Sequence, residues 1–159
     1  MQMQIATRAA YSYRADPNVP VFDDAHPIAF MDGSCALCCF GARMIARLDR
    51  SGHVRICPVQ SRLGEALLQH FGISHVDPDS WLLLDAGVAR GGFDAIAHLG
   101  KHCGGWGHGL RMLMWLPKPL RDGLYRRIAR SRYRLFGRAD LCGLPDAGLR
   151  ARLLVLDDK

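Results

Sequence analysis

The feature that most constrains the fold is a short apolar run that leads directly into a pair of cysteines. Residues 27–39 read PIAFMDGSCALCC, so Cys35 and Cys38 follow the Asp-Gly pair that ends the apolar run. An apolar run of this length, ended by a glycine turn, is typical of a buried strand. Apolar residues then recur at helical spacing as far as Leu48. We therefore expect the two cysteines at a junction between a strand and a helix.

The order of the remaining predicted elements defines the fold class. We expect a strand over 53–59, a helix capped by Ser61 and ended by Gly72, a hairpin over 80–92 that turns at Ala86 and Gly87, helices over 93–102, 110–115 and 119–136, and a short last helix opened by Pro145 with Leu149 and Leu153. Strand, helix, strand, helix, hairpin and helix is the order of a thioredoxin-like core. The predicted fold class is therefore α/β, a thioredoxin-like βαβ-ββα core with additional C-terminal helices.

Length and composition fit one globular domain. The chain has 159 residues, of which 49% are hydrophobic, enough to bury a core. We expect residues 1–26 to form a loose lead-in and residues 27–159 a single domain. We see no apolar run long enough for a membrane span and no secretory signal pattern at the start. Six cysteines without such a signal favour the reducing cytosol, so the predicted location is cytoplasmic.

The spacing of Cys35 and Cys38 suits thiol-disulfide exchange. A thiol attacks a disulfide only as the thiolate, and the unpaired N–H groups at a helix N-terminus stabilise that anion. Cys35 falls in the first helical turn, and Cys38 lies one turn further along the same face. We therefore predict Cys35 as the nucleophile and Cys38 as the resolving thiol. Asp32 is expected to act first as a turn and cap residue, and second in proton transfer with Cys38.

Three segments of the chain resemble one known family. MDGSCALC, residues 31–38, is similar to the signature of the DCC family of thiol-disulfide oxidoreductases, named for an Asp and two Cys near the N-terminus. PVQSRLGEALLQHFG, residues 58–72, resembles the family's strand-and-helix segment around a Gln-Ser pair. Residues 116–145 resemble its C-terminal block, which contains Arg-Tyr-Arg, Phe-Gly and a late Cys. The resemblance extends over about residues 28–154.

This resemblance implies a thioredoxin-like fold with Asp32, Cys35 and Cys38 as functional positions, and it brings no physiological substrate with it. The sequence departs from the pattern in two ways. Cys39 adds a thiol beside the resolving position. Thioredoxin-like proteins usually carry a cis-Pro just before the third core strand, whereas the nearest proline here, Pro78, is not directly before it. The second departure argues against a thioredoxin-type substrate groove.

Three of the other cysteines are predicted to be packed thiols. Cys39 and Cys57 are small enough to be buried like apolar side chains. Cys142 matches the late Cys of the family and is expected to pack under the last loop. Two alternatives stay open: Cys39 could compete as resolving thiol, and Cys142 could be a third redox thiol.

A group of metal-binding residue types follows the predicted hairpin. It contains His98, His102, Cys103 and His108, and its first two members are spaced i, i+4, which can hold zinc on a helix. The glycine-rich segment around them lacks a second CxxC to complete four ligands. Surface histidines are the simpler interpretation, and we expect neither a metal nor a cofactor.

A basic segment near the C-terminus suggests a different kind of function. Seven arginines lie within residues 121–138, and the net charge of +6 favours anionic partners in general. We expect a solvated arginine face on this helix. Apolar residues are predicted to share another face or to be buried: Met112, Met114, Trp115, Leu116, Leu120, Leu124, Tyr125, Ile128, Tyr133 and Phe136.

The predicted function is a thiol-disulfide oxidoreductase that acts on protein or small-molecule disulfides and is recycled by an unidentified reductant. We do not expect a nucleic-acid partner. The alternative is a binding module that uses the basic C-terminal helix on nucleic acid or another anionic surface, with cysteines that sense redox state or are structural. A third interpretation is a metal-binding protein that uses Cys35, Cys38 and the histidines.

Overall fold

The computed structural model describes residues 8–73, 81–105, 109, 112, 115–141, 143 and 146–154. The elements follow one another in this order: η1 (Ser12–Ala15), β1 (Ile28–Met31), α1 (Ala36–Leu48), β2 (Arg55–Pro58), α2 (Arg62–His70), β3 (Leu82–Asp85), β4 (Val88–Gly91), α3 (Gly92–His102), α4 (Lys118–Phe136) and α5 (Ala147–Arg150). The predicted helix over 110–115 falls largely outside the described residues, as does Pro78.

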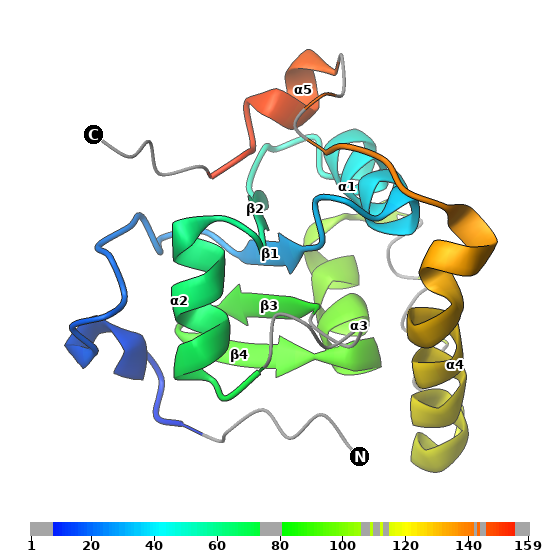
Figure 1. Ribbon diagram of the computed structural model, residues 1–159, viewed down its shortest axis with the longest axis horizontal. Coiled ribbons are helices and arrows are strands. Elements are labelled where there is room, and N and C mark those ends of the chain that lie inside the picture. Colours follow the sequence, from blue (N-terminus) through cyan, green and yellow to red (C-terminus); the bar gives the residue numbers. More distant parts are fainter. Residues whose placement is uncertain are drawn as a thin grey trace.

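The four strands form one mixed sheet in the order β2-β1-β3-β4 (Figure 1). β1 pairs in parallel with β2, with Met31 opposite Pro58. It pairs antiparallel with β3, which continues through a tight turn into β4. A parallel βαβ unit joined to a ββα unit is the thioredoxin-like arrangement, so the predicted α/β fold class is confirmed.

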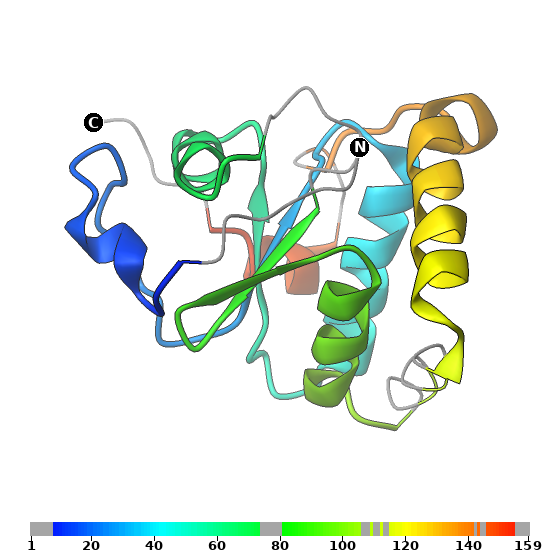
Figure 2. The same ribbon diagram turned by 90° about the horizontal axis from the view of Figure 1, so that it is seen from below.

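Helices cover both faces of the sheet (Figure 2). Alternate residues of a strand point to opposite faces, so Ala29 and Met31 pack against α1 and α3 in one core cluster. Ile28 and Phe30 pack against α2 in a second cluster on the other face. α4 lies outside α1 and α3 and contacts both. The strand-to-helix junction after β1 therefore lies between the sheet and α4.

Local sequence signals set several element boundaries. Ser61 caps α2 by accepting a hydrogen bond from the Gly64 N–H at 3.1 Å, which satisfies one of the free donors of the first turn. Ala86 and Gly87 both have positive φ, at 50° and 75°, as a two-residue hairpin turn requires. Gly72, just beyond α2, is also left-handed. These predicted features are confirmed.

The buried faces of α1 and α4 contain residues other than the apolar ones of helical spacing, and the face of α4 differs from the one predicted. On α1 the buried residues are Cys38, Cys39, Ala42 and Ile45, so the thiols themselves belong to the face that packs on the sheet. On α4 the predicted apolar face points to solvent, and the side chains of Leu120, Leu124 and Ile128 are exposed, as are those of Met112, Trp115 and Phe136. The buried residues of α4 are Arg121, Ala129 and Arg132. The apolar periodicity therefore located the helix but not its inner face.

The last described residues return to the edge of the sheet. Asp146 caps α5 through a hydrogen bond from the Leu149 N–H at 3.1 Å, while Pro145 lies outside the described residues. Leu153 was predicted to be part of the last helix, but it forms a parallel bridge with Ile56 of β2 instead. Arg152 is buried and forms an ion pair with buried Asp49 at 2.6 Å. This pair fixes the C-terminal segment to the end of α1.

Part of the expected lead-in packs against the domain. The Tyr13 side chain is buried in the α2 cluster, and its hydroxyl donates to Asp24 at 2.8 Å. The boundary between lead-in and domain at residue 27 stays a prediction. Within the described residues, no helix is both long and apolar enough to cross a bilayer.

Candidate functional site

Cys35 and Cys38 lie at the junction of β1 and α1, as predicted. Cys35 is the N-cap residue of α1, and its carbonyl accepts the first helical hydrogen bond from the Cys39 N–H at 2.9 Å. Cys38 lies three residues further along, about one helical turn from Cys35, and the Cys35 thiol is near enough to raise the pKa of Cys38. Both residues are buried: Cys35 is 0% exposed and Cys38 is 8% exposed. An attacking thiol has to be reached by its substrate, and in this conformation Cys35 is not accessible.

The cover over Cys35 comes from the segment that follows α4. Residues 137–141 run antiparallel to residues 33–36, and Arg138 forms a bridge with Cys35. Three backbone hydrogen bonds hold this segment: Ala36 N–H to Gly137 O at 3.3 Å, Ala139 N–H to Ser34 O at 3.2 Å, and Leu141 N–H to Gly33 O at 2.8 Å. Figure 1 shows this segment passing from α4 over the start of α1. The dithiol is therefore enclosed by a segment about one hundred residues away in sequence.

Burial keeps Cys38 in its thiol form. The pKa of Cys38 is raised to about 12, mainly by loss of solvation and to a smaller extent by the neighbouring Cys35. The positive charge of Arg132 acts in the opposite direction and lowers this pKa. The Arg132 Nη1 lies 3.9 Å from the Cys38 Sγ.

Asp32 is the centre of a buried hydrogen-bond network. Its Oδ1 accepts from the Ser34 N–H at 2.9 Å, from the Ser34 hydroxyl at 2.8 Å and from Gln60 Nε2 at 2.7 Å. Its Oδ2 accepts from Arg132 Nη2 at 3.0 Å and from the Tyr133 hydroxyl. Burial alone would raise the pKa of Asp32, but the hydrogen bonds, led by that of Tyr133, lower it below its ordinary value. Asp32 is thus held as a carboxylate.

Asp32 forms the predicted turn but not the predicted cap, and its part in proton transfer stays a prediction. It forms the expected turn, because its side chain accepts the N–H two residues ahead. It does not cap α1, since the helix has no side-chain cap hydrogen bond at its N-terminus. Its ion pair with Arg132 is nearly closed to solvent on both sides. Asp32 therefore connects the strand-to-helix turn to α4.

Three members of this network were not predicted as site residues. Gln60 accepts from the Gly33 N–H at 3.0 Å through Oε1 while donating to Asp32 through Nε2. Arg132 and Tyr133 come from the last turns of α4. All three lie in the Gln-Ser and Arg-Tyr-Arg segments by which the chain resembles the DCC family. A buried carboxylate needs hydrogen-bond donors. That requirement could have pointed to the polar residues of the Gln-Ser and Arg-Tyr-Arg segments as partners of Asp32.

The other described cysteines are packed thiols. Cys39 lies on α1 and is buried in the core cluster beside the sheet, as its simpler interpretation predicted. Cys57 lies on the opposite face of the sheet, and burial raises its pKa to about 11. Burial also raises the pKa of Cys103 to about 11. Cys142 lies outside the described residues.

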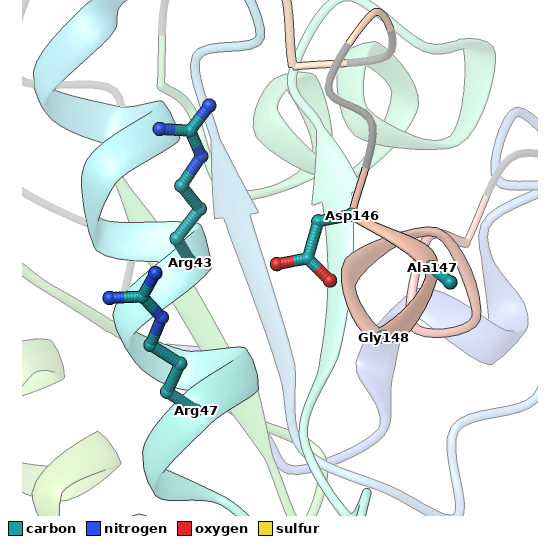
Figure 3. A pocket seen from close by; sticks show the side chains of 5 residues that line it. All are labelled: Arg43, Arg47, Asp146, Ala147 and Gly148. Atoms are coloured by element: carbon teal, nitrogen blue, oxygen red, sulfur yellow. The ribbon is translucent and has the colours of Figure 1, made fainter.

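A shallow hollow of about 470 Å³ opens between α1 and α5 (Figure 3). Arg43 and Arg47 of α1 face it from one side, and Asp146, Ala147 and Gly148 line the other. Its lining includes no cysteine among the described residues. The hollow is therefore not an entrance to the dithiol.

Comparison with known proteins agrees with this geometry. The sequence profile of the DCC1-like thiol-disulfide oxidoreductase family matches residues 29–138. The chain is 29% identical to the uncharacterized protein YuxK of Bacillus subtilis, over 80% of this chain and 93% of that protein. It is 31% identical to a chloroplastic DCC family protein of Arabidopsis thaliana, over 77% of this chain and 72% of that protein. No solved structure gives a significant match. The matched residues contain the cysteine pair, Asp32 and all three of its partners from β2–α2 and α4, and the chain belongs to the DCC1-like thiol-disulfide oxidoreductase family.

Proposed function

We propose that the protein is a thiol-disulfide oxidoreductase in which Cys35 is the nucleophile and Cys38 the resolving thiol. The Cys35 thiolate attacks one sulfur of a substrate disulfide, and the other substrate sulfur leaves as a thiolate and takes a proton. Cys38 then loses its proton and attacks the Cys35 sulfur, which releases the second substrate thiol. The substrate gains two electrons, and the protein is left with a Cys35–Cys38 disulfide. A thiol reductant has to regenerate the pair. If the reduction potential of the pair is higher than that of the substrate, the same steps run in reverse.

The observation that carries this proposal is a cysteine pair at a helix N-terminus beside a buried guanidinium. The positive end of the α1 dipole stabilises negative charge near Cys35. Arg132 lies 3.9 Å from the Cys38 sulfur, where its charge favours the thiolate that the second step requires. Asp32 orients Arg132 through their 3.0 Å ion pair. Since the oxygens of Asp32 already accept five hydrogen bonds, we assign Asp32 a positioning role rather than proton transfer.

Substrate access requires the segment over residues 137–141 to move. Two of its three backbone hydrogen bonds to residues 33–36 are long, at 3.2 and 3.3 Å. Gly137 stands at the end of α4 with φ at 76°, and because glycine has access to more backbone conformations than other residues, the chain can pivot there. The extended edge that the segment vacates would present the Ser34 carbonyl and the Ala36 N–H to a substrate backbone. We propose a protein or peptide disulfide as the substrate class for this reason.

A disulfide reductase assay with single cysteine variants tests the proposal. Cys35→Ser is expected to abolish turnover, and Cys38→Ser to accumulate a mixed disulfide on Cys35 that mass spectrometry detects. Cys39→Ala is the matched control, because Cys39 is a buried neighbour on the same helix, and it is expected to keep activity. Full activity of both Cys35→Ser and Cys38→Ser would contradict the proposal.

One observation favours a second candidate, a binding module that uses α4. Leu120, Leu124 and Ile128 form an exposed apolar row on this helix, and Arg127 and Arg130 are exposed beside them. Apolar and basic residues together on an exposed helix suit an anionic lipid surface. Sedimentation with anionic vesicles tests this, and charge reversal at Arg127 and Arg130 is expected to abolish binding. Equal recovery with neutral vesicles would rule the candidate out.

A further inference from the structure

A second group of polar side chains lies at the end of the sheet opposite the cysteines. Asp85 is the last residue of β3, and His98 and His102 occupy one face of α3. Because β3 runs antiparallel to β1, the end of β3 lies at the start of β1, whereas the cysteines follow the end of β1. The group therefore lies outside the dithiol site and outside the network of Asp32.

The three side chains converge on one point. His98 Nε2 lies 2.8 Å and His102 Nε2 lies 3.0 Å from the same oxygen, Asp85 Oδ2. All three atoms lie within 4.8 Å of one another. The side chains are partly buried, at 18% exposed for Asp85, 20% for His98 and 25% for His102. One histidine would be enough to link α3 to β3 by a hydrogen bond. Two imidazoles and a carboxylate that converge on one point are the residue types that bind zinc.

We propose that Asp85, His98 and His102 form a zinc site in which water occupies the fourth position. Zinc binds imidazole nitrogen and carboxylate oxygen at about 2.0–2.2 Å in tetrahedral geometry, so its ligand atoms stand roughly 3.3 Å apart. The two Asp85–histidine distances, 2.8 and 3.0 Å, need to widen by only a few tenths of an ångström. Three protein ligands with one open position are a known zinc arrangement.

The ligand set differs from the group found in the sequence. Cys103, which follows His102, is buried in the core cluster with α1, and it is not one of the three converging residues. His108 lies outside the described residues. The carboxylate that completes the set comes from β3, thirteen residues before His98, and only the fold brings it near the two histidines.

Protonation at this site is compatible with metal binding. Neutral imidazole and ionised carboxylate are the binding forms. To coordinate through Nε2, His98 has to move its proton to Nδ1, which lies 3.3 Å from Lys101 Nζ. Lys101 is exposed and can turn into solvent, so the change of tautomer meets no buried obstacle.

Neighbouring rings enclose one side of the proposed site. The His53 ring stacks against that of His102 with centroids 6.4 Å apart, and His26 meets His53 edge-on at 4.8 Å. These histidines precede β2 and β1, so all four rings gather at one end of the sheet. Zinc held by Asp85 and the two α3 histidines would fix the end of α3 to β3.

Zinc titration of the purified full chain tests the proposal. Calorimetry is performed with ZnCl₂ under a non-chelating reductant on Cys35→Ser/Cys38→Ser protein, which removes the reactive thiol pair. We expect one equivalent of zinc to bind and to raise the melting temperature. Asp85→Asn is expected to weaken binding at least about tenfold. Asp16→Asn is the matched control, because Asp16 also pairs with a histidine, His70, at 2.7 Å, and it should bind like its parent.

A second variant and a second metal make every outcome informative. His102→Gln keeps a hydrogen-bonding side chain at the site and is expected to lose binding as Asp85→Asn does. Cobalt in place of zinc should give visible bands without the intense near-ultraviolet charge-transfer band of thiolate ligation. The proposal fails if no zinc binds, if Asp85→Asn and His102→Gln bind normally, or if cobalt reports a sulfur ligand. None of these outcomes depends on disulfide reductase activity, so the function proposed above stands or falls separately.

Discussion

Replacing Arg132 by methionine removes the charge that joins α4 to the strand-to-helix turn while keeping most of the apolar stem. Arg132 is buried, and its guanidinium donates to Asp32 Oδ2 at 3.0 Å. Removing one partner of a buried ion pair costs about 3–5 kcal/mol. Here Asp32 keeps four other hydrogen bonds, from Ser34, Gln60 and Tyr133. The loss is then closer to one hydrogen bond to a charged group, about 2–3 kcal/mol.

Urea unfolding followed by circular dichroism measures this loss. Arg130→Met is the matched control, because Arg130 is exposed on the same helix and should change the free energy of unfolding by no more than about 0.5 kcal/mol. A double-mutant cycle with Asp32→Asn should give a coupling energy of at least about 1 kcal/mol, since the two residues share one interaction. If Arg132→Met and Arg130→Met unfold at the same urea concentration, the ion pair does not stabilise the fold and the reasoning is refuted.

Three further predictions concern other parts of the molecule. Gly64→Ala should cost about 1–3 kcal/mol in urea unfolding, because a Cβ would stand 2.4 Å from the carbonyl at the end of β2; Gly123→Ala, with open space around it, should instead stabilise by up to about 1 kcal/mol. Since Asp32 has a lowered pKa in the folded state, the unfolded chain binds the proton first as pH falls. The stability advantage of the parent chain over Asp32→Asn should therefore be complete at pH 7 and shrink below about pH 4, and a gap that widens in acid would contradict this. Arg152→Met should cost about 3–5 kcal/mol through loss of its buried ion pair, whereas exposed Arg150→Met should unfold like the parent, and equal melting temperatures for the two variants would refute that role.

The element order was predictable because it depends on local signals. An apolar run of four or five residues, a serine cap and an Ala-Gly turn each act within a few residues of themselves, and β1, α2 and the hairpin formed where these signals placed them. The inner face of α4 was not predictable in this way. Its apolar row is real, but two buried arginines and one alanine face the protein instead. Burial of an arginine depends on a carboxylate elsewhere in the chain, which helical periodicity does not detect.

The candidate site also has features that local sequence predicts and features that depend on tertiary contacts. The positions of Cys35 and Cys38 follow from one turn of helix after one strand, and sequence spacing was sufficient to predict them. Two partners of Asp32 are distant in the sequence: Gln60 lies 28 positions away and Arg132 lies 100 positions away. Only the tertiary structure brings them to Asp32. The enclosure of the thiols is of the same kind, because it depends on a segment that follows α4. Residue types at a junction can be read locally, whereas their solvent exposure cannot.

The way in which α4 and the covering segment are held indicates which of them would move in the proposed reaction cycle. Arg132 and Tyr133 attach α4 to a buried carboxylate by two charge-assisted hydrogen bonds, and charged hydrogen bonds are stronger than neutral ones. Residues 137–141 are held by three backbone hydrogen bonds, two of them long. If α4 swung away, Arg132 would leave Cys38 and the second step would lose the charge that favours the thiolate. In the proposed cycle, opening at Gly137 would expose Cys35 while Arg132 stays beside Cys38, and of the two motions it is the one that would leave both thiols equipped for exchange.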